Sequence, residues 1–186
     1  MAEWQFGHKI ISVRSDCGGE YQSLNSFFKH LGIAHLVSCP HSHQQNGSAE
    51  RKHRHIVKVV RSLLVHASMP LNFWDEAFLT VVFLINRSPS KVIQQHTSYE
   101  HLHGVAPDYT FLRSFGCAVW PNLRPYNSRK FEFHSKRCVF VGYNNQHKGF
   151  KCLDRVEGHV HISCDVVFDE HSFPFASLHP NAGACL

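Results

Sequence analysis

The chain has 186 residues, 43% of them hydrophobic, which suffices for one ordinary domain or two small ones with a real apolar core and argues against a disordered chain. Its net charge of +5 and pI near 8.9 favour an acidic partner such as nucleic acid, although such a modest excess also occurs in proteins that bind none. Seven scattered cysteines suit reduced thiols rather than a disulfide framework, and neither a signal peptide nor a run long enough to span a membrane is recognisable.

The first half of the chain reads as alternating strands and helices. The predicted elements are a strand at 9–13, a helix at 23–31, a strand at 33–37, a loop at 38–47, a helix from about 47 to 68, a helix at 71–85 and a short helix at 97–103. Gly32 and Gly104 stand where the first and the last of these helices should end, and Pro70 follows the long one. Trp74 and Phe78 are predicted to pack in the core rather than to stack on bases.

The long helix at 47–68 combines an apolar face with a set of cations. The apolar positions recur at intervals of three and four: Ile56, Val60, Leu63, Leu64 and Ala67. The cations are Arg51, Lys52, Arg54, Lys58 and Arg61. On an ordinary surface helix these cations would only be solvated, but they could also neutralise nucleic-acid phosphates.

After Pro107 the pattern changes to short β-rich runs. Strands are predicted at 117–120, 136–142, 149–153 and 159–168, and the segments 151–153 and 159–162 should form a hairpin. Four cysteines are predicted to be small buried hydrophobes: Cys117, Cys138, Cys152 and Cys164. A possible basic rim consists of Arg124, Arg129, Lys130, Lys136 and Arg137. Residues 176–186 read as a loose tail.

Two carboxylates in the first half could serve phosphodiester chemistry. Asp16 lies in the segment RSDCGGEY (residues 14–21), just after a strand and before a Gly-Gly turn, so we expect it at the edge of a sheet. Glu50 lies in QQNGSAERK (residues 44–52), where we expect it in the first turn of the long helix. Two Mg²⁺ ions about 4 Å apart, held by carboxylates, would support in-line displacement at phosphorus. Alternatively, Asp16 makes only an Asx-turn and Glu50 is only a helix-start residue.

The residues flanking Asp16 and Glu50 resemble those of integrases from copia-type long-terminal-repeat retrotransposons. The resemblance extends from about residue 6 to about residue 170 and implies an α/β, ribonuclease-H-like integrase core followed by a small SH3-like β-barrel. It implies an Asp, Asp, Glu triad that trims element DNA and joins it to target DNA with Mg²⁺ or Mn²⁺, with Asp16 and Glu50 as the second and third acids. The segments 115–117, 141–143 and 148–151 resemble signatures of the SH3-like part.

On this basis we expect a partial catalytic core at 1–106, an SH3-like domain at 107–175 and a tail at 176–186. Only 15 residues precede Asp16, so the first acid of the family has no counterpart, and the zinc-binding module is missing because no C-x-x-C occurs. The 33 residues between Asp16 and Glu50 are also fewer than is usual in the family.

The expected protein is therefore a truncated, catalytically incompetent integrase descendant. It would bind DNA through the cations of the long helix, act in the nucleus or cytoplasm, and could form oligomers as the family does. An incomplete core should leave the helices at 56–67 and 73–85 without a full partner layer. The alternative is a non-catalytic, domesticated DNA- or protein-binding module, or a fragment with no selected role.

Overall fold

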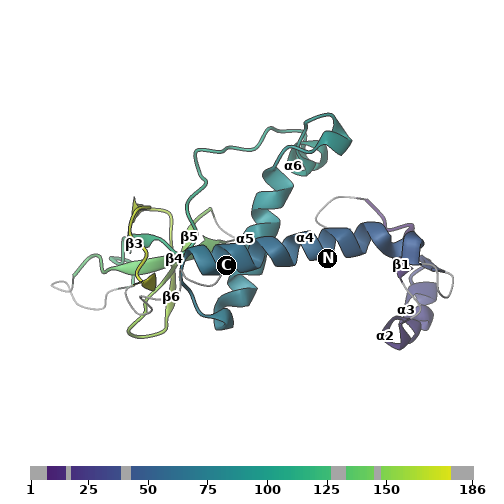
Figure 1. The fold of residues 1–186 in the computed structure, drawn as a ribbon, viewed down its shortest axis with the longest axis horizontal. Helices are drawn as coiled ribbons and strands as arrows, with labels where there is room; N and C mark the ends of the chain where they lie inside the picture. The colour runs from purple at the N-terminus through teal and green to yellow at the C-terminus, as the bar shows by residue number, and fades with distance from the viewer. Residues whose placement is uncertain (1–7, 16–17, 39–42, 127–132, 145–147, 177–186) are drawn as a thin grey trace. The chain divides into compact units, whose positions relative to one another are not determined.

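The computed structural model describes residues 8–15, 18–38, 43–126, 133–144 and 148–176, with the backbone alone given for residues 43–46 and 48 (Figure 1). Two compact units are present, Met1–His55 and Ile56–Leu186. Among the described helices, none is both long and apolar enough to cross a membrane.

The first unit contains a pair of parallel strands and two short helices. Strand β1, Ser12–Ser15, pairs with β2, Ala34–Val37, in the register Ser12↔Ala34 to Ser15↔Val37. The connection carries α2, Gly19–Gln22, and α3, Asn25–His30. The second predicted strand is confirmed, whereas the first begins three residues later than the predicted start at residue 9.

No apolar side chain is buried in the described part of this unit; its buried residues are Ser15 and Ser38. Ile11 is 83% exposed and Phe27 56% exposed. Parallel strands are normally covered on both faces by apolar packing. Within these residues the strand pair is therefore held mainly by hydrogen bonds.

Helix α4 spans His43–His66 and begins four residues before the predicted start at Gly47. Its end is defined by two hydrogen bonds: the Ser68 amide donates to the Val65 carbonyl at 3.0 Å, and the Met69 amide donates to the Leu64 carbonyl at 2.9 Å. This is the Schellman arrangement, in which the residue after the cap is left-handed. Here that residue is Ser68, with φ of 53°, instead of the usual glycine.

The remaining helices lie in the second unit. They are the 3₁₀ turn η1, Leu71–Phe73; helix α5, Trp74–Arg87; the 3₁₀ turn η2, Lys91–Ile93; and helix α6, Ser98–His103. Helix α6 begins at a Thr97 cap, whose Oγ1 accepts from the Glu100 amide at 3.0 Å, and ends at Gly104 with φ of 68°, as predicted. Trp74 is 61% exposed, so its prediction as a core residue is wrong. It opens α5 one turn ahead of Ala77, the first buried position of that helix.

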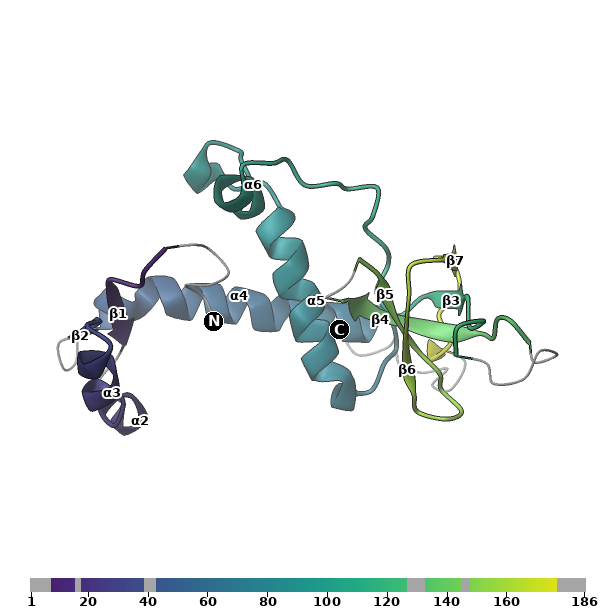
Figure 2. The same cartoon turned by 180° about the vertical axis from the view of Figure 1, so that it is seen from behind.

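A five-stranded antiparallel sheet follows, in the order β6-β5-β4-β3-β7 (Figure 2). Its strands are β3, Ala118–Pro121; β4, Cys138–Tyr143; β5, Phe150–Leu153; β6, Val160–Ser163; and β7, Val166–Asp169. The β5–β6 hairpin is confirmed, with Leu153 paired to Val160. The run predicted as one strand at 159–168 is instead two strands. The chain turns between them at Cys164, which is exposed and not the buried thiol we predicted.

The central strand β4 is buried along its whole length, because apolar groups cover both of its faces. Val139 and Val141 pack with Val60 and Leu64 of α4 and with Val81 of α5. On the other face lies a second core cluster, formed by Cys117, Val119, Cys138, Phe140, Tyr143, Phe150 and Cys152. The helices at 56–67 and 73–85 thus have a partner in the sheet, but Val65 is 59% and Leu79 49% exposed, so that the predicted lack of a full partner layer is not overturned.

Two glycines allow these helices to approach the sheet closely. A Cβ on Gly116, whose φ is 81°, would lie 2.3 Å from the Cβ of Ala67 on α4. A Cβ on Gly142 would lie 2.6 Å from Oγ1 of Thr80 on α5. Lys151 of β5 adds an ion pair to Glu76 of α5 at 2.7 Å. These contacts make the end of α4, α5 and the sheet parts of one compact unit, while the division predicted at residue 106 remains a prediction.

Candidate nucleic-acid interface

The predicted site residue Asp16 lies outside the described residues, but its immediate neighbour is well defined. Ser15 ends β1 and accepts, through its carbonyl, hydrogen bonds from the amide of Ser38 at 3.0 Å and its hydroxyl at 3.2 Å. These bonds fix the carboxyl end of β1 against the residue that follows β2. In α/β sheets, sites form at the carboxyl ends of parallel strands.

A short polar network extends from the same strand end. Ser15 Oγ and His35 Nε2 share a hydrogen bond of 2.8 Å, and His35 Nδ1 lies 2.7 Å from Oδ1 of Asn25. Because the Asn25 oxygen can only accept, His35 carries its proton on Nδ1 when neutral, and Nε2 accepts from the Ser15 hydroxyl. Sequence reasoning missed this network, since its three residues come from separate elements and match no motif.

The structure places Glu50 on the surface of α4. It lies seven residues after His43, about two turns into the helix, so its predicted place in the first turn is wrong. It is the only acidic residue of α4 and is exposed. Its charge therefore cannot act on the positive helix end as we had expected, because that effect is confined to the first turn.

All five predicted cations of α4 are exposed, but they do not share one face. At about 100° per residue, Arg51, Arg54, Lys58 and Arg61 fall within about 80° of arc. We call these four residues the α4 stripe. They lie on the side of the helix away from the buried residues Val60 and Ala67. Lys52 lies about 140° from the centre of the stripe.

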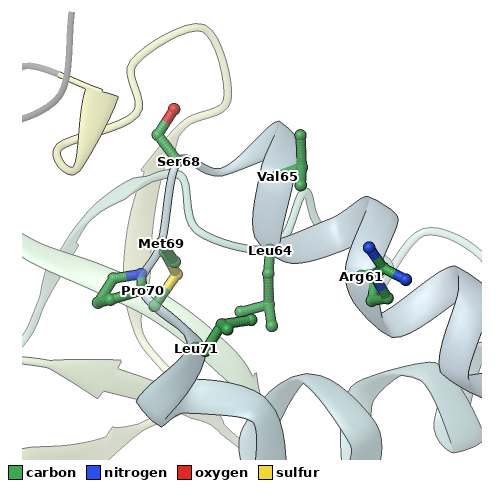
Figure 3. Close-up of a pocket in the computed structure, with 7 residues that line it drawn as sticks. All are labelled: Arg61, Leu64, Val65, Ser68, Met69, Pro70 and Leu71. Carbon is green, nitrogen blue, oxygen red and sulfur yellow. The ribbon is translucent and has the colours of Figure 1, made fainter. Parts of the chain in front are cut away.

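None of the α4 stripe cations has an ion pair with another described side chain. Since α4 carries five Lys and Arg residues against one Glu, its charge is +4 with neutral histidines. The stripe therefore presents positive charge to solvent along about 15 Å, the rise over the ten residues from Arg51 to Arg61. Arg61 also borders a pocket at the end of the helix (Figure 3).

The predicted basic rim of the sheet is different, because carboxylates engage one of its cations. Lys136 forms ion pairs with Asp154 and, at 3.0 Å, with Glu157. The hydrogen bond to Asp154 raises the pKa of Lys136. Burial alone would raise the pKa of the Asp154 carboxyl, but the bonds from Lys136 and the Val156 amide outweigh it and the pKa is lowered.

The other predicted rim residues do not form one surface that the structure defines. Arg137 donates to the Ser172 hydroxyl at 2.7 Å, and Arg124 is exposed. Arg129 and Lys130 lie outside the described residues. Among the described residues, only the α4 stripe thus combines several neighbouring cations that have no carboxylate partner.

The described side chains form no metal-binding cluster, and the buried thiols of the sheet are unreactive. Where side chains are described, no group of three His, Cys, Asp or Glu residues is placed to hold a metal ion. Burial raises the pKa of Cys117 to about 12, of Cys138 to about 11 and of Cys152 to about 12. These thiols stay protonated near neutrality, as expected for buried hydrophobes.

The fold of the second unit agrees with a family assignment for the sheet. Residues 117–181 match the family described as the retroviral polymerase SH3-like domain. They cover all five strands of the sheet and lie close to the predicted domain at 107–175.

Similarity to curated proteins extends over almost the whole chain. It is 44% identical over 177 residues to the retrovirus-related Pol polyprotein from transposon RE1 of Arabidopsis thaliana, covering 95% of this chain and 12% of that protein. It is 37% identical over 172 residues to the Pol polyprotein from transposon TNT 1-94 of Nicotiana tabacum, covering 91% of this chain and 13% of that protein. The predicted relationship to copia-type retrotransposon Pol polyproteins is thereby confirmed, and the chain corresponds to about an eighth of their length.

Among solved structures, a chain of the simian T-cell lymphotropic virus intasome in complex with PP2A regulatory subunit B56 gamma resembles this one. The TM-score is 0.46 at 17% identity, covering 87% of this chain and 58% of that chain. This TM-score is too low to assign the fold of the first unit, for which a ribonuclease-H-like core remains a prediction.

Proposed function

We propose that this chain is an integrase-derived segment that binds nucleic acid through the α4 stripe. The observation that carries the proposal is the row of four exposed cations, without an ion pair to any described side chain, on the side of α4 turned away from its packed face. The relationship to retrotransposon Pol polyproteins supports it independently. Of the stripe, Lys58 and Arg61 lie in the half of α4 that packs on the sheet.

The dimensions of the stripe suit a nucleic-acid backbone. Its length of about 15 Å corresponds to about four nucleotides at 3.4 Å per phosphate along one strand. Contacts of this kind position a protein on the backbone and carry no sequence information. We therefore expect binding that depends little on sequence and strongly on salt.

The salt dependence gives a quantitative test. Four phosphate contacts predict a slope of log K against log salt of about −3.6, so affinity should fall about 150-fold between about 50 and about 200 mM salt. Replacing Arg51, Arg54 and Lys58 with alanine should leave a slope of about −0.9, and a fall of only about fourfold over the same range. Arg61 is retained because it also borders the pocket.

The measurement is fluorescence anisotropy of a labelled duplex with the full chain. The matched control replaces three exposed lysines away from the stripe, Lys29, Lys52 and Lys91, and so removes the same charge. The control should keep a slope near that of the unmodified chain. Equal slopes for the two triple variants would show that net charge, and not the stripe, governs binding.

For catalysis, we propose that Asp16 and Glu50 are the second and third acids of the family triad. Their carboxylates are the oxygen donors that Mg²⁺ and Mn²⁺ prefer, so the donor chemistry fits these ions. They are two ligands, however, and the described side chains supply no group of three. A bound metal ion would supply activation of an attacking oxygen. This chain's own described part is the end of β1, the strand before Asp16 in the sequence, which the Ser15, His35 and Ser38 contacts fix.

We accordingly propose that the chain by itself performs no strand transfer, and that it acts in the nucleus or cytoplasm within a ribonuclease-H-like, oligomeric assembly of the family type. The test is a strand-transfer reaction on short duplex DNA with Mg²⁺ or Mn²⁺. Product that disappears in Asp16→Asn and Glu50→Gln would refute the proposed inactivity and show that another carboxylate completes the site.

A further inference from the structure

A pocket at the end of α4 shares only Arg61 with the α4 stripe. It has a volume of about 530 Å³, within the range of ligand-binding clefts. Its lining residues are Arg61, Leu64, Val65, Ser68, Met69, Pro70 and Leu71. Figure 3 shows that they come from the last turns of α4 and from the chain that reverses into η1.

The pocket exists because α4 stops abruptly. The left-handed Ser68 turns the chain back, Pro70 is extended with ψ of 156°, and η1 then begins with Leu71 beside Leu64. Leu64 and Met69 are buried, and they form the floor. Val65 is 59% exposed and Leu71 73% exposed, so two large apolar side chains of the rim face solvent.

The described lining of the pocket has two polar side chains, Arg61 and Ser68. Arg61 contributes a guanidinium, which can only donate hydrogen bonds and is always charged. Ser68 contributes a hydroxyl, and no carboxylate is among the described residues that line the pocket. A molecule that binds here must therefore offer apolar groups to the lining and an acceptor or negative charge to Arg61.

We propose that this pocket binds a short segment of a partner protein that presents apolar side chains next to a carboxylate. The apolar side chains cover Val65, Leu71 and Leu64, and the carboxylate pairs with Arg61. Arginine pairs well with carboxylates because its planar fork can donate two parallel hydrogen bonds.

A nucleobase is the weaker match. Single-stranded nucleic acids are held by aromatic side chains on which bases stack, and the lining of this pocket has none. Its wall is aliphatic, with a single thioether, which suits leucine-like side chains. The stripe and the pocket thus meet at Arg61 but select different chemical groups.

The test uses the full chain labelled with ¹³C in Leu, Val and Met methyl groups. The probe is the peptide acetyl-Leu-Leu-Glu-amide, and acetyl-Leu-Leu-Gln-amide is its uncharged match. We expect saturable shifts of the Leu64, Val65, Met69 and Leu71 methyls at millimolar peptide. The Gln peptide should bind about twofold to fivefold more weakly, because that is the contribution of an ion pair at an exposed arginine.

Variants locate the effect. Arg61→Gln should remove the difference between the two peptides, and Leu71→Ser should weaken both, while Leu102→Ser, an equally mild change at a half-exposed leucine of α6, should weaken neither. Arg54→Ala with Lys58→Ala should leave peptide affinity unchanged, which separates this inference from the nucleic-acid proposal. Equal affinity for the two peptides, or no saturable shift, would overturn it. So would a short single-stranded oligonucleotide that shifts the same methyls and loses binding in Leu71→Ser.

Discussion

Replacing Gly116 with alanine should destabilise the second unit. The loss should be larger than for a glycine of similar backbone conformation whose added Cβ would meet no other atom. The new Cβ would lie 2.3 Å from the Cβ of Ala67 and 3.4 Å from its Cα, whereas nonbonded carbons prefer about 3.5–4.0 Å. Ala67 is fully buried and cannot move aside. The backbone at φ of 81° costs an alanine about 1–2 kcal/mol, and the forced displacement about 1–3 kcal/mol more.

Gly158→Ala is the matched control. Gly158 has φ of 72° and no atom within 4 Å of its would-be Cβ, so it shares the backbone cost and the unfolded-state effect but lacks the contact. Urea unfolding, followed by tryptophan fluorescence, should give Gly116→Ala a free energy of unfolding about 1–3 kcal/mol lower than Gly158→Ala. Equal midpoints for the two variants would refute the close packing of α4 on the sheet.

Two further predictions concern the helix end and the β5–β6 turn. Ser68→Gly should raise the free energy of unfolding by about 0.5–1 kcal/mol, because it relieves a left-handed serine, whereas Ser62→Gly within α4 should lower it by a similar amount in the same urea titration. The lowered pKa of Asp154 means that the unfolded chain binds its proton more readily, so this group's stabilisation is present above pH 3.8 and is lost as pH falls through the folded-state pKa. Asp154→Asn should be less stable near neutrality and lose less stability on acidification, as followed by circular dichroism; an unchanged acid profile would rule out a contribution from the Lys136 pair.

Local patterns in the sequence were enough for much of the second unit. The spacing of Val60, Leu64 and Ala67 identified the packed face of α4, because a helical period leaves few alternatives. Gly104 ended α6 where predicted, since a left-handed residue favours glycine. The β-rich run at 136–142 predicted the strand found as β4, Cys138–Tyr143, although not that both of its faces are covered.

Features that depend on distant contacts could not be predicted in this way. The long helix was predicted to begin near Gly47, yet α4 begins at His43 and runs through this glycine, because one glycine costs a long helix only about 1 kcal/mol. Cys164 reads as part of a strand but lies at the turn between β6 and β7. Lys136 forms an ion pair with Asp154, and only the folded sheet brings these two residues together.

The sequence predicted which cations could form the candidate nucleic-acid interface. Which of them lie on one side of the helix became clear only from the structure. Sequence reasoning grouped Lys52 with the other cations because all five lie outside the apolar face of the helix, but Lys52 points about 100° away from its neighbour Arg51. The network of Ser15, His35 and Asn25 joins a strand, a second strand and a helix, so no local spacing reveals it.

The most direct test of nucleic-acid binding through the α4 stripe compares two lysines of the same helix. Lys58 belongs to the stripe and Lys52 lies on another side, and both are exposed. Acetylation by a small reagent, quantified by mass spectrometry with and without saturating duplex DNA, reports which amine the DNA covers. Binding through the stripe predicts strong protection of Lys58, little protection of Lys52, and loss of the difference at high salt. Equal protection of both lysines, or protection of Lys52 alone, would contradict it.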